Sequence, residues 1–131
     1  MKNSSLQAAK RAKNDEFYTL YEDIAKEVEN YDLRGMKVYC PCDDYRKSNF
    51  VKYFKDNFQK LGITHLTATN YDIGEGAWRY DYDGENETVV ALEGNGDFQS
   101  DECTAIKDLC DVVITNPPFS LFRAFVKWLN L

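Results

Sequence analysis

Residues 111–119 read DVVITNPPF, an apolar run that ends in a double proline. The run is short, continuous and rich in β-branched side chains, which is typical of a strand buried in a parallel sheet. The two prolines fix the backbone φ angle and remove two N–H donors, so the strand cannot continue through them. Apolar residues at helical spacing follow from Phe119 onward. The segment therefore predicts a buried strand, a rigid turn and a helix.

Strands and helices alternate along the rest of the chain. Apolar spacing predicts helices over residues 19–31, 48–61 and 101–110. The second of these has Ser48 as its expected N-cap and Gly62 as its stop. The expected strands cover residues 36–40, 63–69 and 111–115, and a hairpin of segments 77–82 and 87–92 turns at Asp83-Gly84. This order predicts an α/β fold, with an incomplete parallel sheet, flanking helices and a β-hairpin insertion.

Ligands of open α/β sheets bind at the carboxyl ends of the strands. Polar or aromatic residues gather after the expected strands and in one further turn. These segments are residues 40–44, 70–72, 97–98 and 116–119. We therefore expect the binding site among these four segments.

The Asn-Pro-Pro-Phe turn suits a reaction at an aromatic amine. The lone pair of such an amine is delocalised into the ring, so the amine is a poor nucleophile. The side-chain oxygen of Asn116 and the carbonyl of Pro117 can hold its two N–H bonds and localise the lone pair toward a sulfonium methyl. Phe119 would stack on a base that has left the duplex. The alternative is a plain strand-ending turn whose Phe119 joins the core.

Composition limits the remaining possibilities. The 131 residues suit one domain, and the 44% hydrophobic and 15% aromatic content argues against disorder. No apolar run reaches the roughly 20 residues that span a bilayer, and no secretory signal is visible, so a cytoplasmic location is expected. The net charge of -6 is unfavourable for nucleic-acid binding, but residues 1–13 form a basic tail. That tail is either solvated or a DNA-facing arm.

The cysteine pattern does not indicate a metal site. Cys40 and Cys42 are separated by one residue, and His65 is the single histidine. Further ligands would have to come from the region of Cys103 and Cys110. We expect free, mostly buried thiols and no bound metal.

Several segments together resemble a known enzyme family. The sequence is similar to the amino-methyltransferase superfamily, and most closely to the EcoRI-like adenine-specific DNA methyltransferases. The resemblance runs from about Asn14 to Leu131. NPPF alone is shared with methyltransferases acting on protein glutamine and RNA guanine, so the upstream segments carry the closer assignment. The matching segments are NDEFYTLYEDIAKE (14–27), KVYCPCDDYRKSNFVKYF (37–54), GNGDFQS (94–100) and DVVITNPPFSLFR (111–123).

The resemblance implies a Rossmann-like fold that binds S-adenosyl-L-methionine and methylates the N6 amine of a flipped adenine in DNA, as in restriction-modification systems or mobile elements. It assigns catalytic roles to Asn116, Pro117, Pro118 and Phe119. The donor-binding residues that it implies are Phe17, Tyr18 and Thr19 at the methionine end, Cys40, Asp43 and Asp44 after the first strand, and Asp97 and Phe98 at the adenine.

Two details depart from the family pattern. Residues 40–44 contain no glycine where most relatives have a glycine-rich loop. Either Asp43 or Asp44 could reach the donor amino group or ribose in its place. The family pattern also places an acidic residue after the second strand. In this sequence either Asn70, which is nearest to the strand, or Asp72, two residues later, could occupy that position.

The domain is expected to be partial, with residues 14–131 forming the donor-binding part of a methyltransferase. Weak donor binding and poor or no DNA methylation are therefore expected of these residues alone. A second chain or copy could complete the sheet. The alternatives are a truncated, non-catalytic binding module and a methyltransferase acting on an RNA guanine amine or a protein glutamine amide.

Overall fold

The computed structural model of the protein describes residues 19–116 and 119–129. Within them, strands and helices alternate as the sequence predicts. The sequence predictions that fall outside these residues concern the basic tail 1–13, Phe17, Tyr18, Pro117 and Pro118.

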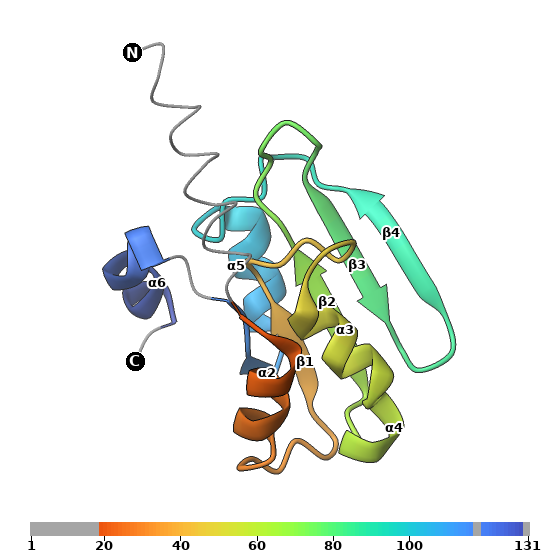
Figure 1. Ribbon diagram of the computed structural model, residues 1–131. Helices are drawn as coiled ribbons and strands as arrows, with labels where there is room; N and C mark the ends of the chain where they lie inside the picture. The colour runs from red at the N-terminus through yellow and green to blue at the C-terminus, as the bar shows by residue number, and fades with distance from the viewer. Residues whose placement is uncertain (1–18, 117–118, 130–131) are drawn as a thin grey trace.

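Five strands of the described residues form one sheet in the order β4-β3-β2-β1-β5 (Figure 1). β1 (Lys37–Cys40), β2 (His65–Thr69) and β5 (Val112–Val113) run parallel to one another. The hairpin strands β3 (Trp78–Tyr82) and β4 (Glu87–Ala91) continue the sheet antiparallel to β2. The α/β class is confirmed, but the sheet is mixed, because the expected hairpin insertion extends the sheet itself.

The hairpin turns where the sequence predicts. Gly84 has a φ of 98°, which a residue without a Cβ adopts readily. The Asp83 side chain accepts hydrogen bonds from the backbone N–H groups of Glu85 and Asn86 at 2.9 and 2.7 Å. An aspartate that satisfies the turn backbone in this way fixes the pairing of β3 with β4.

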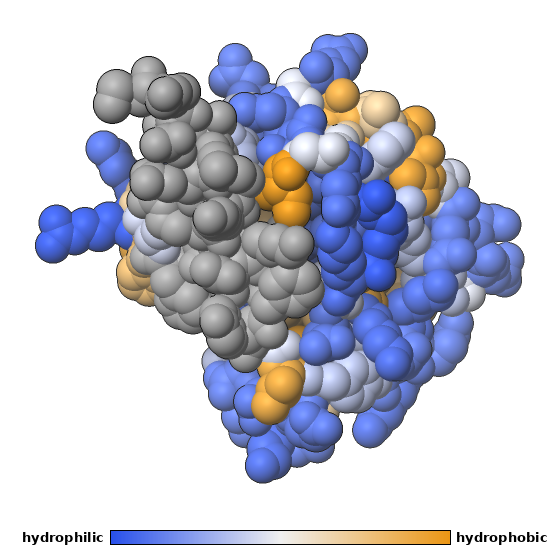
Figure 2. Space-filling model, turned by 45° about the horizontal axis from the view of Figure 1, so that its top comes forward, coloured by the Kyte–Doolittle hydropathy of each residue, from blue (hydrophilic) through white to orange (hydrophobic). Residues whose placement is uncertain are grey.

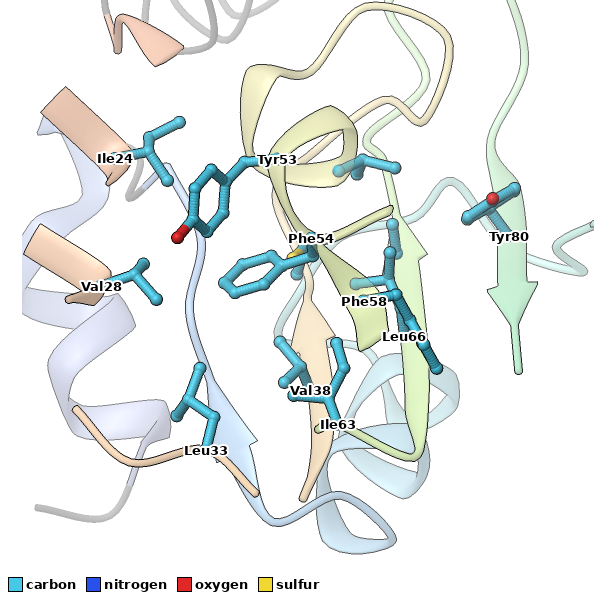
Figure 3. Packing of buried hydrophobic residues seen from close by; sticks show 13 residues of the cluster. Ile24, Val28, Leu33, Val38, Tyr53, Phe54, Phe58, Ile63, Leu66 and Tyr80 are labelled. Carbon is cyan, nitrogen blue, oxygen red and sulfur yellow. The ribbon is translucent and has the colours of Figure 1, made fainter. Parts of the chain in front are cut away.

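Three helices cover one face of the sheet: α2 (Tyr21–Val28), α3 (Asn49–Asp56) and α4 (Phe58–Leu61) (Figure 1). Figure 3 shows apolar side chains of these helices directed toward β1 and β2. Alternate residues of β1 and β2 face this layer, as the pleat of a strand requires. The buried side chains of this core are Ile24, Val28, Leu33, Val38, Cys40, Val51, Tyr53, Phe54, Phe58, Ile63, Leu66, Ala68 and Tyr80.

The opposite face of the sheet is covered by α5 (Asp101–Asp108). The Cys103 thiol lies 3.8 Å from the hydroxyl of Thr69, which also bonds the Tyr39 hydroxyl at 2.7 Å. After the short helix η1 (Phe119–Leu121), α6 (Phe122–Trp128) packs beside α5. It is held there by the indole N–H of Trp128, which donates to the Thr104 hydroxyl at 2.9 Å, and by the Lys107 ammonium, which donates to the Trp128 carbonyl.

The helix expected over residues 48–61 is interrupted at Asn57. The Ser48 cap is confirmed, since its hydroxyl accepts from the N–H groups of Phe50 and Val51, and Gly62 ends α4 with a φ of 70°. At Asn57 the backbone leaves helical geometry, with φ -110° and ψ 18°. Its side-chain amide donates to the Tyr53 carbonyl at 2.9 Å, and the same carbonyl accepts from the Asn57 backbone N–H at 3.0 Å.

Several elements are shorter than expected, the first helix and the last strand most of all. The first helix covers Tyr21–Val28, within the predicted residues 19–31. The strand predicted over residues 111–115 is paired as a strand at Val112 and Val113, and both are half-buried. The prediction that this strand is fully buried is wrong for the described residues, because β5 pairs with β1 alone and lies at the edge of the sheet.

The described surface seen in Figure 2 is largely hydrophilic, with apolar side chains in small groups. Among the described helices, none has the length and apolar character needed to pass through a bilayer. The large apolar side chains that are exposed are Leu20, Tyr31, Val89, Val90, Leu109, Leu121 and Phe122.

The burial of the core predicts that a Phe→Ala substitution lowers the free energy of unfolding by very different amounts at two positions. Phe54 is 0% exposed and Phe122 is 51% exposed. Phe54→Ala should lower the free energy of unfolding by about 3–5 kcal/mol, because it leaves a cavity between α3 and the sheet. Phe122→Ala should cost less than about 1 kcal/mol. Urea denaturation measures both values, and equal losses would contradict this assignment of the core.

Candidate functional site

The segments that follow β1, β2 and β5 meet at one edge of the sheet, together with the turn at residues 94–98. The N–H of Asp43 donates to the Thr69 carbonyl at 3.0 Å and joins the first two segments. The N–H of Cys42 donates to the Thr115 hydroxyl at 3.0 Å and joins the first to the third. The N–H of Asp72 donates to the Asn95 carbonyl at 2.8 Å. The segments among which the binding site is expected therefore lie together.

Asp43 lies at the centre of this junction and is only 2% exposed. Its Oδ1 accepts from the Ser48 hydroxyl at 2.6 Å, at the start of α3. Its Oδ2 accepts from the Thr115 hydroxyl and from the N–H of Asn116, the latter at 3.3 Å. The buried Asp43 carboxylate thus links the loop after β1 to the start of α3 and to the end of β5.

Burial raises the pKa of Asp43 above its ordinary value, since the charged form loses solvation. The hydrogen bonds donated by Ser48, Thr115 and the Asn116 backbone oppose this rise, and the neighbouring charge of Asp44 adds to it.

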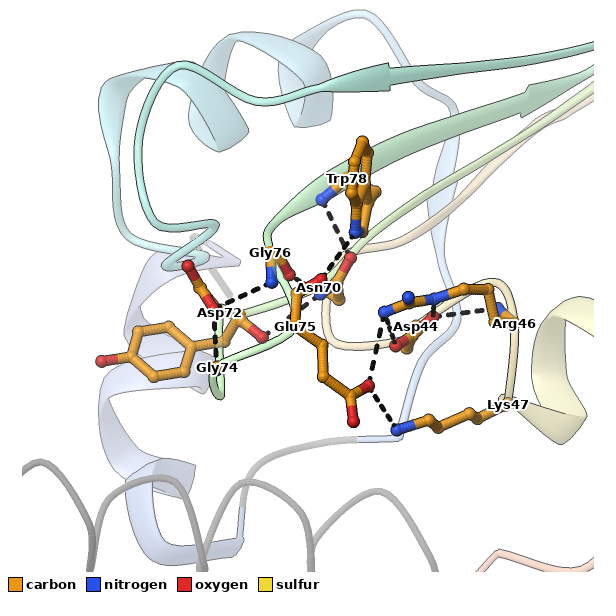
Figure 4. Close-up of polar contacts among 10 residues, drawn as sticks. Asp44, Arg46, Lys47, Asn70, Asp72, Gly74, Glu75, Gly76 and Trp78 are labelled. Carbon is orange, nitrogen blue, oxygen red and sulfur yellow. Dashed lines mark hydrogen bonds and ion pairs between the residues drawn. The ribbon is translucent and has the colours of Figure 1, made fainter.

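Asp44 is also buried, but a cation neutralises it. Burial works to raise its pKa, yet the hydrogen bonds and charge of Arg46 outweigh that effect and hold the pKa below its usual value. The guanidinium donates to both carboxylate oxygens, at 3.0 and 2.8 Å. Arg46 and Lys47 also pair with Glu75 at 3.6 and 2.8 Å (Figure 4). These contacts fasten residues 72–76 to the loop that follows β1.

Asn70 and Asp72 are the two candidates for the residue after β2 that would bind the donor ribose. Both form hydrogen bonds within residues 70–78 (Figure 4). The Asn70 amide donates to the Gly76 carbonyl at 2.9 Å, and its oxygen accepts from the N–H of Trp78 at 3.0 Å. Asp72 Oδ1 accepts from the N–H groups of Gly74 and Gly76 at 2.8 and 3.0 Å. Asn70 is buried and Asp72 is exposed, so Asp72 is the more accessible of the two.

The turn at residues 94–98 lies against the end of β2. Gly96 has a φ of 80°, and a Cβ there would lie 1.8 Å from the Asn70 carbonyl oxygen, so only glycine fits. Asp97 is half-buried, and its Oδ1 accepts from the N–H of Gln99 at 2.9 Å. Phe98 is buried, with ring centroids 5.3 Å from both Phe125 and Trp128 of α6.

Asn116 is 1% exposed and is held from two sides. Its Oδ1 accepts from the Thr19 hydroxyl at 2.8 Å, while its N–H donates to Asp43. The Thr19 carbonyl in turn accepts from the Asn49 side chain at 3.0 Å. The structure therefore brings together Thr19, expected at the donor, and Asn116, expected at the target amine.

The other expected site residues are placed differently. Cys40 is fully buried in the core beneath α2–α4. Phe119 begins η1, but its side chain, like Pro117, Pro118, Phe17 and Tyr18, lies outside the described residues. Among the residues described, no three His, Cys, Asp or Glu side chains are grouped as a metal site would require.

The sequence reasoning missed the polar partners of Asp43. Ser48 was expected only as a helix cap, yet its hydroxyl also donates to Asp43. Thr115 was treated as the last residue of an apolar strand. The sequence did hint at its role, because Thr115 is the one polar residue after Asp111 in the predicted strand 111–115.

The family described as "Adenine-specific methyltransferase EcoRI" matches residues 5–130. The chain is 43% identical over 120 residues to type II methyltransferase M.MpnI of Mycoplasma pneumoniae and 40% identical over 120 residues to M.MgeORF184P of Mycoplasma genitalium. Each match covers 90% of this chain and 38% of the relative.

Type II methyltransferase M.EcoRI of Escherichia coli is 39% identical over 144 residues, which cover 95% of this chain and 44% of that protein. The chain thus spans about two fifths of the length of these relatives. No solved structure matches the chain.

The contact at Gly96 predicts that two alanine substitutions in one turn differ in effect. Gly96→Ala should lower the free energy of unfolding by roughly 2 kcal/mol or more, because of its positive φ and the Asn70 carbonyl. Gly94→Ala meets nothing closer than Glu102 Oε1 at 3.5 Å and should cost less than about 1 kcal/mol. Chemical denaturation of both variants tests this, and a harmless Gly96→Ala would contradict the close packing.

The two adjacent aspartates predict opposite pH dependences of stability. The folded-state pKa of Asp43 is raised, so its contribution to stability is present at low pH and is lost as pH rises through that pKa. The folded-state pKa of Asp44 is lowered, so its contribution is present above the ordinary value of 3.8 and is lost as pH falls.

The measurement is the free energy of unfolding of the wild type minus that of each Asn variant, between about pH 3 and 7. The difference should fall with rising pH for Asp43→Asn and increase for Asp44→Asn. Slopes of the same sign would show that the two carboxylates do not differ as described.

Proposed function

Because the chain belongs to the EcoRI family of adenine-specific methyltransferases, we propose that it forms the donor-binding part of an enzyme that methylates the N6 amine of adenine in DNA. The observation that carries this proposal is the junction of Asn116 with the loop after β1. A target-amine residue and a donor loop must be neighbours if a methyl group is to pass between their ligands. Here Asp43 binds the backbone of Asn116 directly.

We assign the donor, S-adenosyl-L-methionine, to the edge of the sheet where β1, β2 and β5 end, in a Rossmann-like arrangement. The residues at this edge fit the chemistry of such a ligand. Asp97 is half-buried and uses Oδ1 for the turn backbone, so its Oδ2 can accept from the adenine amine of the donor. The bare backbone of Gly96 lets this turn approach β2 closely. When bound, the donor supplies an electrophilic methyl group on a positively charged sulfur.

Asn116 would hold the target amine. Its side-chain oxygen accepts from the Thr19 hydroxyl. We propose that the same oxygen also accepts from an N–H of the adenine amine, and that the Pro117 carbonyl accepts from the other N–H. These acceptors localise the lone pair of the amine, so no strong base is required before attack. Phe119 is proposed to stack on the flipped base.

DNA is the proposed substrate, and we propose a restriction-modification or mobile-element setting for it. The relatives, each named a type II methyltransferase, support the first of these settings. A cytoplasmic location follows, because the substrate is there. β5 lies at the edge of the described sheet, so further chain or a second copy would have a free edge to pair with. The complete activity belongs to such an assembly, since this chain spans about two fifths of its relatives.

Donor binding tests the first part of the proposal. Titration calorimetry with S-adenosylhomocysteine should show weak binding by the chain. Asp97→Asn should lower that affinity by about tenfold, because it removes a charged acceptor but keeps a group for the Gln99 N–H. The exposed Asp108→Asn serves as the control and should leave the affinity unchanged. A folded chain that gives neither heat nor a thermal shift would favour a non-catalytic module.

The identity of the methyl acceptor needs a separate measurement. The chain is offered tritium-labelled S-adenosylmethionine together with DNA, RNA and protein. Transfer by these residues alone should be poor, and any label should be recovered as N6-methyladenine in DNA. Asn116→Ala should lower the transfer rate by about a hundredfold or more. Label in an RNA guanine or a protein glutamine would contradict the assigned acceptor, and robust transfer by the 131 residues would contradict their partial role.

A further inference from the structure

The loop after β1 offers two carboxylates, and their surroundings separate their roles. Asp44 binds Arg46 with both oxygens, and Arg46 reaches on toward Glu75 at the surface. Asp43 points the other way, into the junction beneath Asn116, and is 2% exposed. Both oxygens of Asp43 accept bonds from the protein itself, so its carboxylate has little capacity left for a ligand.

The hydrogen bonds around Asp43 have fixed directions. The Thr115 hydroxyl oxygen accepts from the N–H of Cys42, so its own proton is directed to Asp43 Oδ2. The Ser48 hydroxyl oxygen accepts from the N–H groups that begin α3, so its proton is directed to Asp43 Oδ1. The N–H of Asn116 adds a third donor. Three donors converge on one residue, and the two oxygens of a carboxyl group have enough lone pairs to accept all of them.

This set of bonds spans the parts that would have to be aligned during methyl transfer. The backbone of Asp43 is bonded to the end of β2 through the Thr69 carbonyl. Its side chain is bonded to the end of β5 at Thr115 and Asn116. A shift of the loop relative to β5 would therefore leave a buried carboxylate short of donors, which is costly.

We propose that Asp43 is a positioning residue, which fixes Thr115 and the backbone of Asn116 against the loop after β1 and so sets the direction of the Asn116 side chain. It acts through these residues and does not contact the donor. The identity of the amine that Asn116 meets rests on the proposed function, whereas the fixing of Asn116 by Asp43 does not. Thr115 is part of the same device, because its hydroxyl links the N–H of Cys42 to the carboxylate.

Hydrogen exchange of the Asn116 amide, followed by NMR, tests this role alongside calorimetry with S-adenosylhomocysteine. Thr115→Val keeps the shape of the side chain but removes the hydroxyl. It should speed exchange of the Asn116 amide by about tenfold or more and leave the affinity for S-adenosylhomocysteine within about threefold. Thr115→Ser keeps the hydroxyl and should restore slow exchange. Asp44→Asn is the matched control in the same loop and should leave the Asn116 amide unchanged.

A pH titration gives a signature that general loosening would not produce. The chemical shift of the Asn116 amide should titrate together with the Asp43 carboxyl carbon, and this titration should be absent in Asp43→Asn. An unchanged Asn116 amide in Thr115→Val, with an affinity loss of about tenfold or more, would show instead that this pair binds the donor. Failure of the wild type to bind S-adenosylhomocysteine would count against the proposed function, while the exchange rates would still decide the role of Asp43.

Discussion

A buried carboxylate must find hydrogen-bond donors, and Asp43 finds them in two elements beyond its own loop. Ser48 begins α3, and Thr115 and Asn116 end β5. Ser48 is only five residues from Asp43, but Thr115 and Asn116 are more than 70 residues away and reach it because β5 pairs with β1. The carboxylate therefore keeps all its donors only when these strands are paired. The same bonds place Asn116 beside the loop where the donor is proposed to bind, so the hydrogen-bond requirement of one buried carboxyl group organises the whole site.

Much of the fold follows from local patterns. Ser48 and Gly62 mark the ends of the α3–α4 segment because capping and a left-handed φ are properties of single residues. The Asp83-Gly84 turn is likewise encoded within four residues. The strands ending near Cys40 and Thr69 could be recognised from their apolar runs, and the convergence of their ends follows from the geometry of parallel sheets.

What the sequence could not provide depends on contacts between distant segments. The break at Asn57 falls within an unbroken apolar pattern, and the partial burial of β5 depends on what lies next to it in the sheet. The choice between Asp43 and Asp44 was open because both occupy one loop. The structure separates them by their partners. Asp44 is paired with Arg46, whereas Asp43 is bonded to Thr115 at the end of β5.

We propose that the ends of β1, β2 and β5 form a methyl-donor site, with Asn116 on the side of the target amine and Asp43 behind it. A crystal structure with S-adenosylhomocysteine bound is the decisive experiment. Ligand density is expected along these strand ends, with the adenine beside Asp97 and the Asp43 carboxylate still bonded to Thr115. Density elsewhere on the molecule, or a bond from Asp43 to the ligand, would contradict it.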